Sequence, residues 1–261
     1  MTATAQLLQQ RSFGQLKLHM ERDGPKLIRE HGASKLRLPR RSHEAIIINT
    51  GGGLAGGDQF EHEFSCGEHS LLTLTSQAAE RVYQTLGPPA IISTQMNAEK
   101  NSQLMWLPQE TILYDGASLQ RSFSVCLAQG ARFLAVEPVI CGRTEMGENI
   151  SQIHLKDRWR VMRDGVVIYA EDLLMGPKLP ISKSTLAGAK AFACVIYVAD
   201  DAERRLEDVR AVMNKSDGAS AWNGKLIARV LATDGFLLRK ALIPVLNMLA
   251  GPNALPKLWT A

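Results

Sequence analysis

The pattern of apolar and polar residues along the chain is that of a β-rich protein over most of its length. Between about Gln15 and Ala199, short segments that are β-branched or alternate between apolar and polar side chains are bounded by Gly, Pro, Asn or Asp. This rhythm is typical of an all-β domain, since alternation turns one set of side chains to a core and the other to solvent. The expected strands are 15–20, 45–48, 60–64, 70–75, 90–97, 103–107, 111–114, 122–127, 132–140 and 152–156.

The clearest local prediction is a hairpin around Asp164-Gly165. Alternating segments at 158–162 and 166–170 flank this dipeptide. Asp-Gly supplies the positive φ angles that a tight two-residue turn requires. We therefore expect two antiparallel strands joined at this point.

Helical periodicity is found mainly towards the C-terminus. Residues 201–213 place apolar side chains on one face, as in a surface amphipathic helix. Residues 235–250 are strongly apolar and are followed by Gly251-Pro252, a helix stop. Pro244 interrupts this segment and removes one backbone hydrogen bond, so we expect a kink or two abutting helices. The fold class is therefore mainly β, a single domain over 1–261 that is β-rich at about 13–199 and helical at about 200–261.

Charge and cysteine content narrow the class of protein. The 261 residues carry 30 Lys plus Arg and 26 Asp plus Glu, a formal charge of +4, which is too small an excess to indicate nucleic-acid binding. The basic run at 35–41 fits the solvated face of a half-buried strand, with a phosphate-binding patch as the alternative. Four widely spaced cysteines indicate neither a disulfide framework nor a zinc knuckle. No leader or membrane-spanning stretch is visible, and we expect a cytoplasmic protein that binds neither membrane nor nucleic acid.

The most conspicuous segment is a glycine-rich loop. Ile46-Ile47-Ile48 runs into Asn49-Thr50-Gly51-Gly52-Gly53-Leu54-Ala55-Gly56-Gly57-Asp58. Such a loop can present backbone N–H groups to an anion. However, no Lys-Ser/Thr pair closes it, and the residues after it alternate like a strand rather than a helix. A tight turn between strands is therefore the favoured interpretation, with phosphate binding as the alternative.

Three further segments carry carboxylates at the ends of expected strands. Residues 75–83 contain Glu80, residues 106–117 end near Asp115, and Glu137 is followed by the cluster at 142–148 with Glu145 and Glu148. Taken one at a time, such carboxylates usually cap turns or pair with arginine.

The ordered set of these segments resembles the UreD/UreH family of urease accessory proteins. The resemblance is carried by the glycine-rich loop at 49–58, Thr-Ser-Gln-Ala-Ala-Glu-Arg-Val-Tyr at 75–83, Trp-Leu-Pro-Gln-Glu-Thr-Ile-Leu-Tyr at 106–114 and Gly-Arg-Thr-Glu-Met-Gly-Glu at 142–148. It extends from about Phe13 to the closing Pro256-Lys257-Leu258-Trp259, where Lys257 replaces the Arg of the family's ending. Lysine offers a point charge rather than a bidentate contact.

The resemblance implies a mostly β protein with C-terminal helices that acts without a catalytic residue of its own. It implies partners of the UreF type and, through them, a UreG-type GTPase on apo-urease. It also implies help with nickel entry, alongside carbamylation of an active-site lysine, through an internal path for the ion. No tightly bound cofactor is expected, only transient Ni²⁺.

Candidate residues for such a path are the carboxylates of these motifs. They are Asp58, Glu80, Asp115, Glu137, Glu145 and Glu148, which suit weak, water-mediated passage of a hydrated cation but equally suit structural ion pairs. A path that must release nickel should avoid a tight cage of imidazoles and thiolates. The six histidines show no metal-binding spacing; His62 and His69 lie in neighbouring expected strands, although a surface or core role is the more common one.

The apolar C-terminus offers a second candidate surface. Apolar side chains near a terminus are either buried or reserved for a partner. As partner-binding residues we consider Phe236, Leu238, Leu242, Leu246 and Trp259. Two other functions stay open: a β-scaffold that binds proteins without any nickel path, and a hydrolase using Asp58 or Glu80 as base with Thr75 or Ser76. No motif supplies a histidine near those groups, which disfavours the hydrolase.

Overall fold

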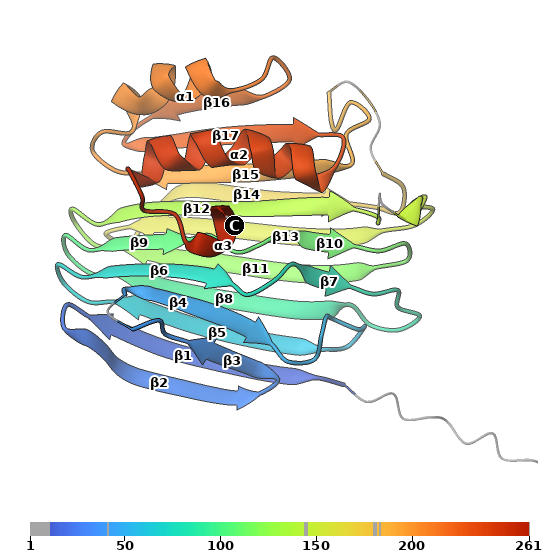
Figure 1. Ribbon diagram of the computed structural model, residues 1–261, viewed down its shortest axis with the longest axis horizontal. Helices are drawn as coiled ribbons and strands as arrows, with labels where there is room; N and C mark the ends of the chain where they lie inside the picture. The colour runs from blue at the N-terminus through green and yellow to red at the C-terminus, as the bar shows by residue number, and fades with distance from the viewer. Residues whose placement is uncertain (1–10, 41, 144–145, 180–181, 183, 261) are drawn as a thin grey trace, which may run out of the picture.

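The computed structural model describes residues 11–40, 42–143, 146–179, 182 and 184–260 and consists mainly of two large β-sheets (Figure 1). Sheet A has seven strands. In spatial order they are β14 (Val166–Met175), β13 (His154–Arg163), β11 (Ser118–Leu127), β8 (Ala90–Ala98), β5 (Gln59–Cys66), β1 (Phe13–Glu21) and β2 (Gly24–Gly32).

Sheet B has ten strands. Its main path is β16 (Gly218–Trp222), β17 (Lys225–Ala232), β15 (Ala191–Val198), β12 (Arg132–Cys141), β9 (Gln103–Trp106), β6 (Leu71–Ser76), β4 (Glu44–Asn49) and β3 (Ser34–Arg37). Two short strands lie off this path: β10 (Thr111–Leu113) pairs with β12, and β7 (Glu80–Val82) pairs with β10.

The chain coils between the two sheets. From β4 to β13 it alternates between sheet B and sheet A, and the strands that become neighbours in each sheet run parallel. The result is a β-solenoid-like stack, visible in Figure 1 as successive levels from β1 and β2 to β15 and β17. Antiparallel pairs occur at the two ends of the stack, as in β1 with β2 and β13 with β14.

Two apolar clusters fill the space between the sheets, and a third lies on the outer face of sheet B. The first contains Leu18, Leu74 and Phe133. The second, towards the other end of the strands, contains Phe60 and Val139. The third is covered by α2 (Gly235–Ala250), which packs on β15 and β17, with α3 (Lys257–Thr260) and α1 (Leu206–Val212) beside it. A 3₁₀ helix, Glu203–Arg205, leads directly into α1.

Most expected strands are confirmed. The hairpin has the expected register, with Arg163 opposite Val166 and positive φ at Asp164 and Gly165. Residues 35–37 of the basic run belong to β3, whose Leu36 side chain is buried. The segments expected at 152–156 and 158–162 belong to one strand, β13.

The C-terminal helices are confirmed, but the same part of the chain also holds two unexpected strands. β16 and β17 extend sheet B at residues expected to be helical. Consecutive side chains of β17 are buried on both faces of the strand. The helix α2 covers one face, and the core between the two sheets covers the other. Pro244 lies inside α2, which is one helix rather than two abutting ones. Within the described residues, no helix has the length and apolar character needed to cross a bilayer.

Candidate functional site

The glycine-rich loop connects β4 to β5 and packs on the segment around β7. Asn49 Nδ2 donates to the Gly53 carbonyl oxygen at 3.1 Å and to both Glu80 oxygens at 3.0 and 3.2 Å. A Cβ atom at Gly53 would lie 2.8 Å from the Arg81 carbonyl oxygen, so only glycine fits there. Several loop N–H groups already bond within the protein, including those of Gly51, Leu54 and Gly57. These contacts support the tight-turn interpretation over phosphate binding.

Asp58 closes this loop as a structural cap. Its side chain is buried and accepts hydrogen bonds from the Ser12 N–H at 2.7 Å and the Ala55 N–H at 2.8 Å. Both carboxylate oxygens are therefore engaged by the backbone. Its role is to hold the loop against the start of β1.

Glu80 is half-buried and is the first of a series of ionisable groups that continues between the sheets. Burial raises the pKa of Glu80 to about 7; the hydrogen bond from Asn49 offsets part of this rise and the nearby charge of Asp58 adds to it. Glu80 lines two hollows at once. The outer one, about 140 Å³, is bounded by the glycine-rich loop and residues 76–81. The inner one, about 70 Å³, lies between the sheets.

The inner cavity belongs to a layer of polar side chains that separates the two apolar clusters between the sheets. On β5, Phe60 lies in one cluster, Phe64 in the other and His62 between them. The same order recurs on neighbouring strands, with an apolar side chain on either side of a polar one. This polar layer comprises His62, Thr94, Arg121, Asp157 and Glu171 from sheet A and Glu137, Cys194 and Arg229 from sheet B.

Arg121 joins the two sheets within the polar layer. Its Nε donates to Asp157 Oδ1 at 3.1 Å and its Nη2 to Asp157 Oδ2 at 2.5 Å, while Nη1 donates to Glu137 Oε2 and to Thr111 Oγ1. Trp106 Nε1 donates to the other oxygen of Glu137 at 2.6 Å. Burial lowers the pKa of Arg121, but the charges of Asp157 and Glu137 outweigh it and raise the pKa above its usual value. Burial raises the pKa of Glu137 to about 7, and Arg121 offsets part of that rise.

A third, smaller cavity continues the series beyond Glu137. It measures about 20 Å³ and is lined by Glu137, Asp157, Glu171, Cys194 and Arg229 among others. Arg229 Nη2 lies 2.7 Å from Glu171 Oε1, and Cys194 Sγ lies 3.7 Å from Glu171 Oε2. Glu137, Cys194 and Arg229 are direct neighbours across three strands. The Arg229 side chain is 54% exposed, so the layer reaches the surface there.

Neighbouring cavities in this series therefore share a lining carboxylate. Glu80 lines the outer and the inner ones, and Glu137 lines the inner and the third one. Of the five candidate carboxylates that lie within the described residues, these are the two that line the cavities. Among the described side chains, no group of three or more His, Cys, Asp or Glu is arranged to hold a metal ion.

Two other candidate carboxylates lie at exposed turns away from these cavities. Asp115 accepts from the N–H groups of Ser151 at 2.6 Å and Gln152 at 2.9 Å, and these bonds lower its pKa. Glu148 pairs with Arg143 at 3.1 Å, a hydrogen bond that lowers the pKa of Glu148. Both act as turn caps. Glu145 lies outside the described residues.

Most of the residues predicted to bind a partner are buried in the structure. Leu238, Leu242, Leu246 and Trp259 are fully buried in the chain's own core, because α2 and α3 cover the outer face of sheet B. Trp259 Nε1 donates to the Leu107 carbonyl oxygen at 2.8 Å, and Arg239 packs over the Trp259 ring. Only Phe236, 76% exposed, is available to a partner.

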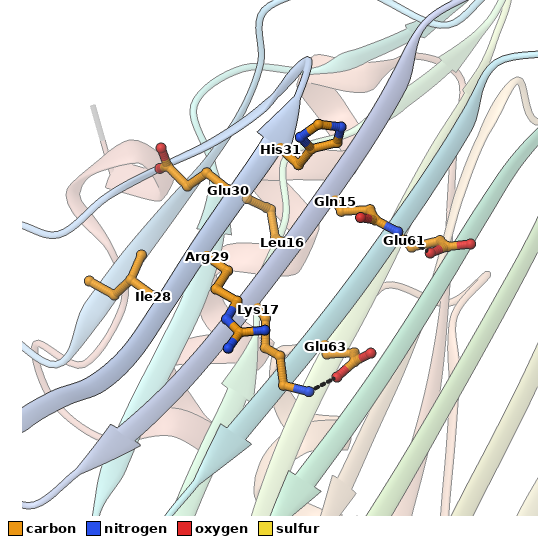
Figure 2. Close-up of a pocket in the computed structure, with 9 residues that line it drawn as sticks. All are labelled: Gln15, Leu16, Lys17, Ile28, Arg29, Glu30, His31, Glu61 and Glu63. Atoms are coloured by element: carbon orange, nitrogen blue, oxygen red, sulfur yellow. Dashed lines mark hydrogen bonds and ion pairs between the residues drawn. The ribbon is translucent and has the colours of Figure 1, made fainter.

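A further hollow lies on the outer face of β1, β2 and β5 (Figure 2). It is more open than the cavities described above, and its charged side chains are exposed. Its charged side chains pair across the strands: Lys17 Nζ lies 2.5 Å from Glu63 Oε2, and Gln15 Nε2 donates to Glu61 Oε2 at 2.7 Å. These are exposed ladder contacts, which typically contribute little to stability. The face is a solvated sheet surface.

Sequence reasoning missed Arg121, Asp157, Glu171 and Arg229. The sequence feature that could have identified them is a charged residue at a position of an alternating strand where the side chain points into the core. On β11, Leu119, Arg121 and Phe123 face the same side, and on β13 Leu155, Asp157 and Trp159 do so. A charge at such a position predicts a buried polar contact without identifying its partner.

The fold and the site define a two-sheet, solenoid-like β protein with a line of ionisable side chains through its interior. The family model described as UreD urease accessory protein matches residues 12–260. The chain belongs to the UreD family of urease accessory proteins.

Individual relatives agree with this assignment. The chain is 41% identical to the urease accessory protein UreD of Agrobacterium fabrum, over 88% of this chain and 83% of that protein. It is 39% identical to the urease accessory protein UreD of Sinorhizobium medicae over the full length of both. It is 42% identical to that of Rhizobium johnstonii over 91% of this chain and 90% of that protein.

Proposed function

We propose that this chain assists urease maturation as a non-enzymatic accessory protein that gives nickel ions a path through its interior. The observation that carries the proposal is the series of three cavities joined by Glu80 and Glu137. The path begins at the glycine-rich loop, crosses the polar layer and ends at Arg229. Its partners are proteins of the UreF and UreG types acting on apo-urease, whose active-site lysine is carbamylated at the same stage.

The charges along the path suit a divalent cation. Glu80, Glu137, Asp157 and Glu171 line it together with Arg81, Arg121 and Arg229. Four carboxylates and three guanidinium groups give a formal charge of −1 when all are ionised. Oxygen ligands shared with water bind nickel more weakly than a cage of imidazoles and thiolates, which allows release at the far end.

The proposal places this process in the cytoplasm. All four cysteines, Cys66, Cys126, Cys141 and Cys194, carry free thiols, as is usual for proteins of a reducing compartment. The hydrolase alternative is disfavoured at Asp58, which is bound by two backbone N–H groups, and at Ser76, whose Oγ donates to the Ala78 carbonyl oxygen, although Glu80 lines the same cavities as Ser76. A β-scaffold without a nickel path is the second candidate, and the experiment below separates the two.

The test is urease activation at defined nickel and bicarbonate concentrations, with UreF-type and UreG-type partners held constant. We expect activation to require the chain and to fall several-fold with Glu80→Gln or Glu171→Gln, since each removes a negative charge from the path. Glu137 is avoided, because it is one of the two carboxylates that pair with the buried Arg121, and breaking a buried ion pair costs about 3–5 kcal/mol of stability. Glu61→Gln, on the solvated outer face, is the matched control and should leave activation unchanged.

Complex formation is measured on the same samples by co-purification. A nickel path requires activation to fall while the complex still assembles. If activation falls only in proportion to lost assembly, the chain is a scaffold and the path is rejected. If urease is activated equally well without the chain, the accessory role itself is wrong.

A further inference from the structure

Sheet A ends at a long edge strand, β14, that is open to further pairing. Within the described residues β14 pairs with β13 alone, and no backbone–backbone hydrogen bond joins it to another segment. Its ten residues include no Lys, Arg or Pro, and the apolar side chains of Val166, Val167 and Leu174 are exposed. A bulge at Ile168 interrupts the pairing with β13, so residues 169–175 are the regular part that an added strand could join.

The other strands at the ends of the two sheets are protected. An edge strand presents unpaired N–H and C=O groups, and proteins commonly guard it with proline, with charged side chains or by making it short. β2, at the opposite end of sheet A, contains Pro25, Lys26 and Arg29. β3 and β16, at the ends of the main path of sheet B, have only four and five residues. Among these four strands, β14 is the long and unguarded one.

Sheet B extends beyond β14 and leaves part of its inner face uncovered. β14 lies opposite β17, since Glu171 Oε1 is 2.7 Å from Arg229 Nη2. β16 continues sheet B past this level (Figure 1). Ser220 of β16 lies opposite Ile227 of β17, a residue of the core between the sheets, so Ser220 and Trp222 project on the side that faces sheet A. Both are exposed, and a strand added beside β14 would cover them.

Arginine side chains with unused hydrogen-bond donors lie beside this uncovered face. Arg229 is half-exposed and, within the described residues, forms an ion pair with Glu171 alone. Arg163, at the end of β13, reaches the turn between β16 and β17, where a Cβ atom at Gly224 would lie 3.1 Å from its Nη1. Arg163 forms no ion pair with any described residue, and its Nε has no hydrogen-bond partner. Because a guanidinium group binds a carboxylate through two parallel hydrogen bonds, acidic side chains fit this face.

We propose that an extended, acidic segment of a partner protein adds to β14 as a further strand of sheet A. Its inward acidic side chains lie at Arg229 and Arg163, and an apolar side chain lies on Trp222. In strand addition the backbone hydrogen bonds give affinity, and alternate side chains give specificity. The inference does not depend on the nickel path, although Arg229 is the proposed end of that path.

A second copy of this chain fits the edge less well than an acidic segment. The two acidic residues of β14, Glu171 and Asp172, are already paired within the chain, with Arg229 and Arg160. The β14 strand of a second copy therefore supplies no free carboxylate to the arginines.

The first test is hydrogen exchange of the purified full-length chain in the presence of a synthetic peptide of alternating Val and Glu. A peptide of alternating Val and Lys is the matched control. We expect the acidic peptide to slow exchange several-fold at the β14 amides that do not bond to β13, less so at high salt, and to leave β2 unchanged. Unchanged exchange at β14 with millimolar acidic peptide, or equal slowing by both peptides, would overturn the proposal.

The second test assigns the contact to the arginines. Arg163→Gln leaves no carboxylate unpaired and should weaken binding of the acidic peptide several-fold, as should Arg229→Gln. Lys17→Gln is the matched control, because Lys17 is also a half-exposed cation on sheet A, paired with Glu63, and should bind the peptide like wild type. Circular dichroism checks that each variant is folded. Wild-type affinity in both folded arginine variants would contradict an acidic occupant.

Two further outcomes are distinguished by the same measurements. Concentration-dependent protection of β14 in the chain alone, together with dimerisation, would identify a second copy as the occupant and overturn the proposal of a partner segment. The peptide experiments contain no nickel. Their failure therefore leaves the nickel path standing, and failure of the urease activation experiment leaves this surface standing.

Discussion

At the scale of single residues, the side chains of the polar layer differ in how many hydrogen-bond and ion-pair partners they have. Arg121 is shared by Asp157 and Glu137, whereas among the described residues the Glu80 side chain bonds only to the Asn49 amide and the His62 ring has no partner. Fully paired charges fix the sheets relative to one another, and underpaired groups leave room for a ligand. Both kinds of group line the inner cavity, the paired Arg121 and Glu137 as well as the underpaired Glu80 and His62.

Glu80 gives this layer a measurable pH dependence. Its pKa is about 7 in the fold against 4.5 as the reference value, so the folded state holds the proton more tightly between these pH values. The stabilising contribution is fully present below about pH 4.5 and is lost as pH rises through about 7. Glu80→Gln removes this titration. We expect the variant to gain stability relative to wild type by roughly 3 kcal/mol between pH 4.5 and pH 8.

The measurement is the free energy of unfolding in urea at several pH values. Glu61→Gln, at an exposed position, should run parallel to wild type across the same range. A stability difference between Glu80→Gln and wild type that is independent of pH would show that Glu80 is ionised in the fold throughout.

The sequence could reveal part of this site. Glu80 and Glu137 stand in motifs that are visible in the chain, and both line the cavities. Arg121 and Asp157 are visible only as charges at inward positions of strands. Their pairing depends on β11 and β13 being parallel neighbours in exact register, and alternation within one strand carries no information about its neighbour.

At the scale of elements, α2 shows how an apolar segment is divided between core and surface. Its residues Leu238, Leu242, Val245, Leu246 and Leu249 are buried on sheet B, whereas Phe236 and Leu237 in the first turn are exposed. Composition predicts an apolar helix but not which face is covered, because the covering strands β15 and β17 come from elsewhere in the chain.

This division leads to a paired prediction for α2. Leu242→Ala should lower the free energy of unfolding by about 2–5 kcal/mol, because it opens a cavity in the core. Phe236→Ser should change it by less than about 0.5 kcal/mol yet weaken co-purification with the UreF-type partner. The two variants are compared by urea unfolding and by pull-down. Full partner binding by Phe236→Ser would exclude the start of α2 as a docking surface.

The strands show the same limit on prediction. Their existence follows from alternation and turn residues, as at Asp164-Gly165, where both φ angles are positive. β16 and β17 were missed because two short strands within an otherwise helical region resemble its connecting segments. Their identity is decided by pairing with β15, a tertiary contact.

At the scale of the whole molecule, the solenoid-like coiling explains why a polar layer can cross the interior. Parallel strands in register bring equivalent inward positions of successive coils together. One polar side chain per strand then forms a continuous layer between two apolar clusters. Alternation in the sequence predicts a β protein, but the chain shows no repeat of fixed period from which this coiling could be inferred.

The most direct test of an internal nickel path is to block it without changing any charge. Ser76 lines both the outer and the inner cavity beside Glu80, so Ser76→Leu should fill their junction. Ser122→Leu adds the same bulk on the exposed face of β11 and is the control. The measurement is nickel bound to urease per assembled accessory complex. We expect Ser76→Leu to lower it at least several-fold and Ser122→Leu to leave it unchanged; equal nickel delivery by both variants would contradict a path through the protein.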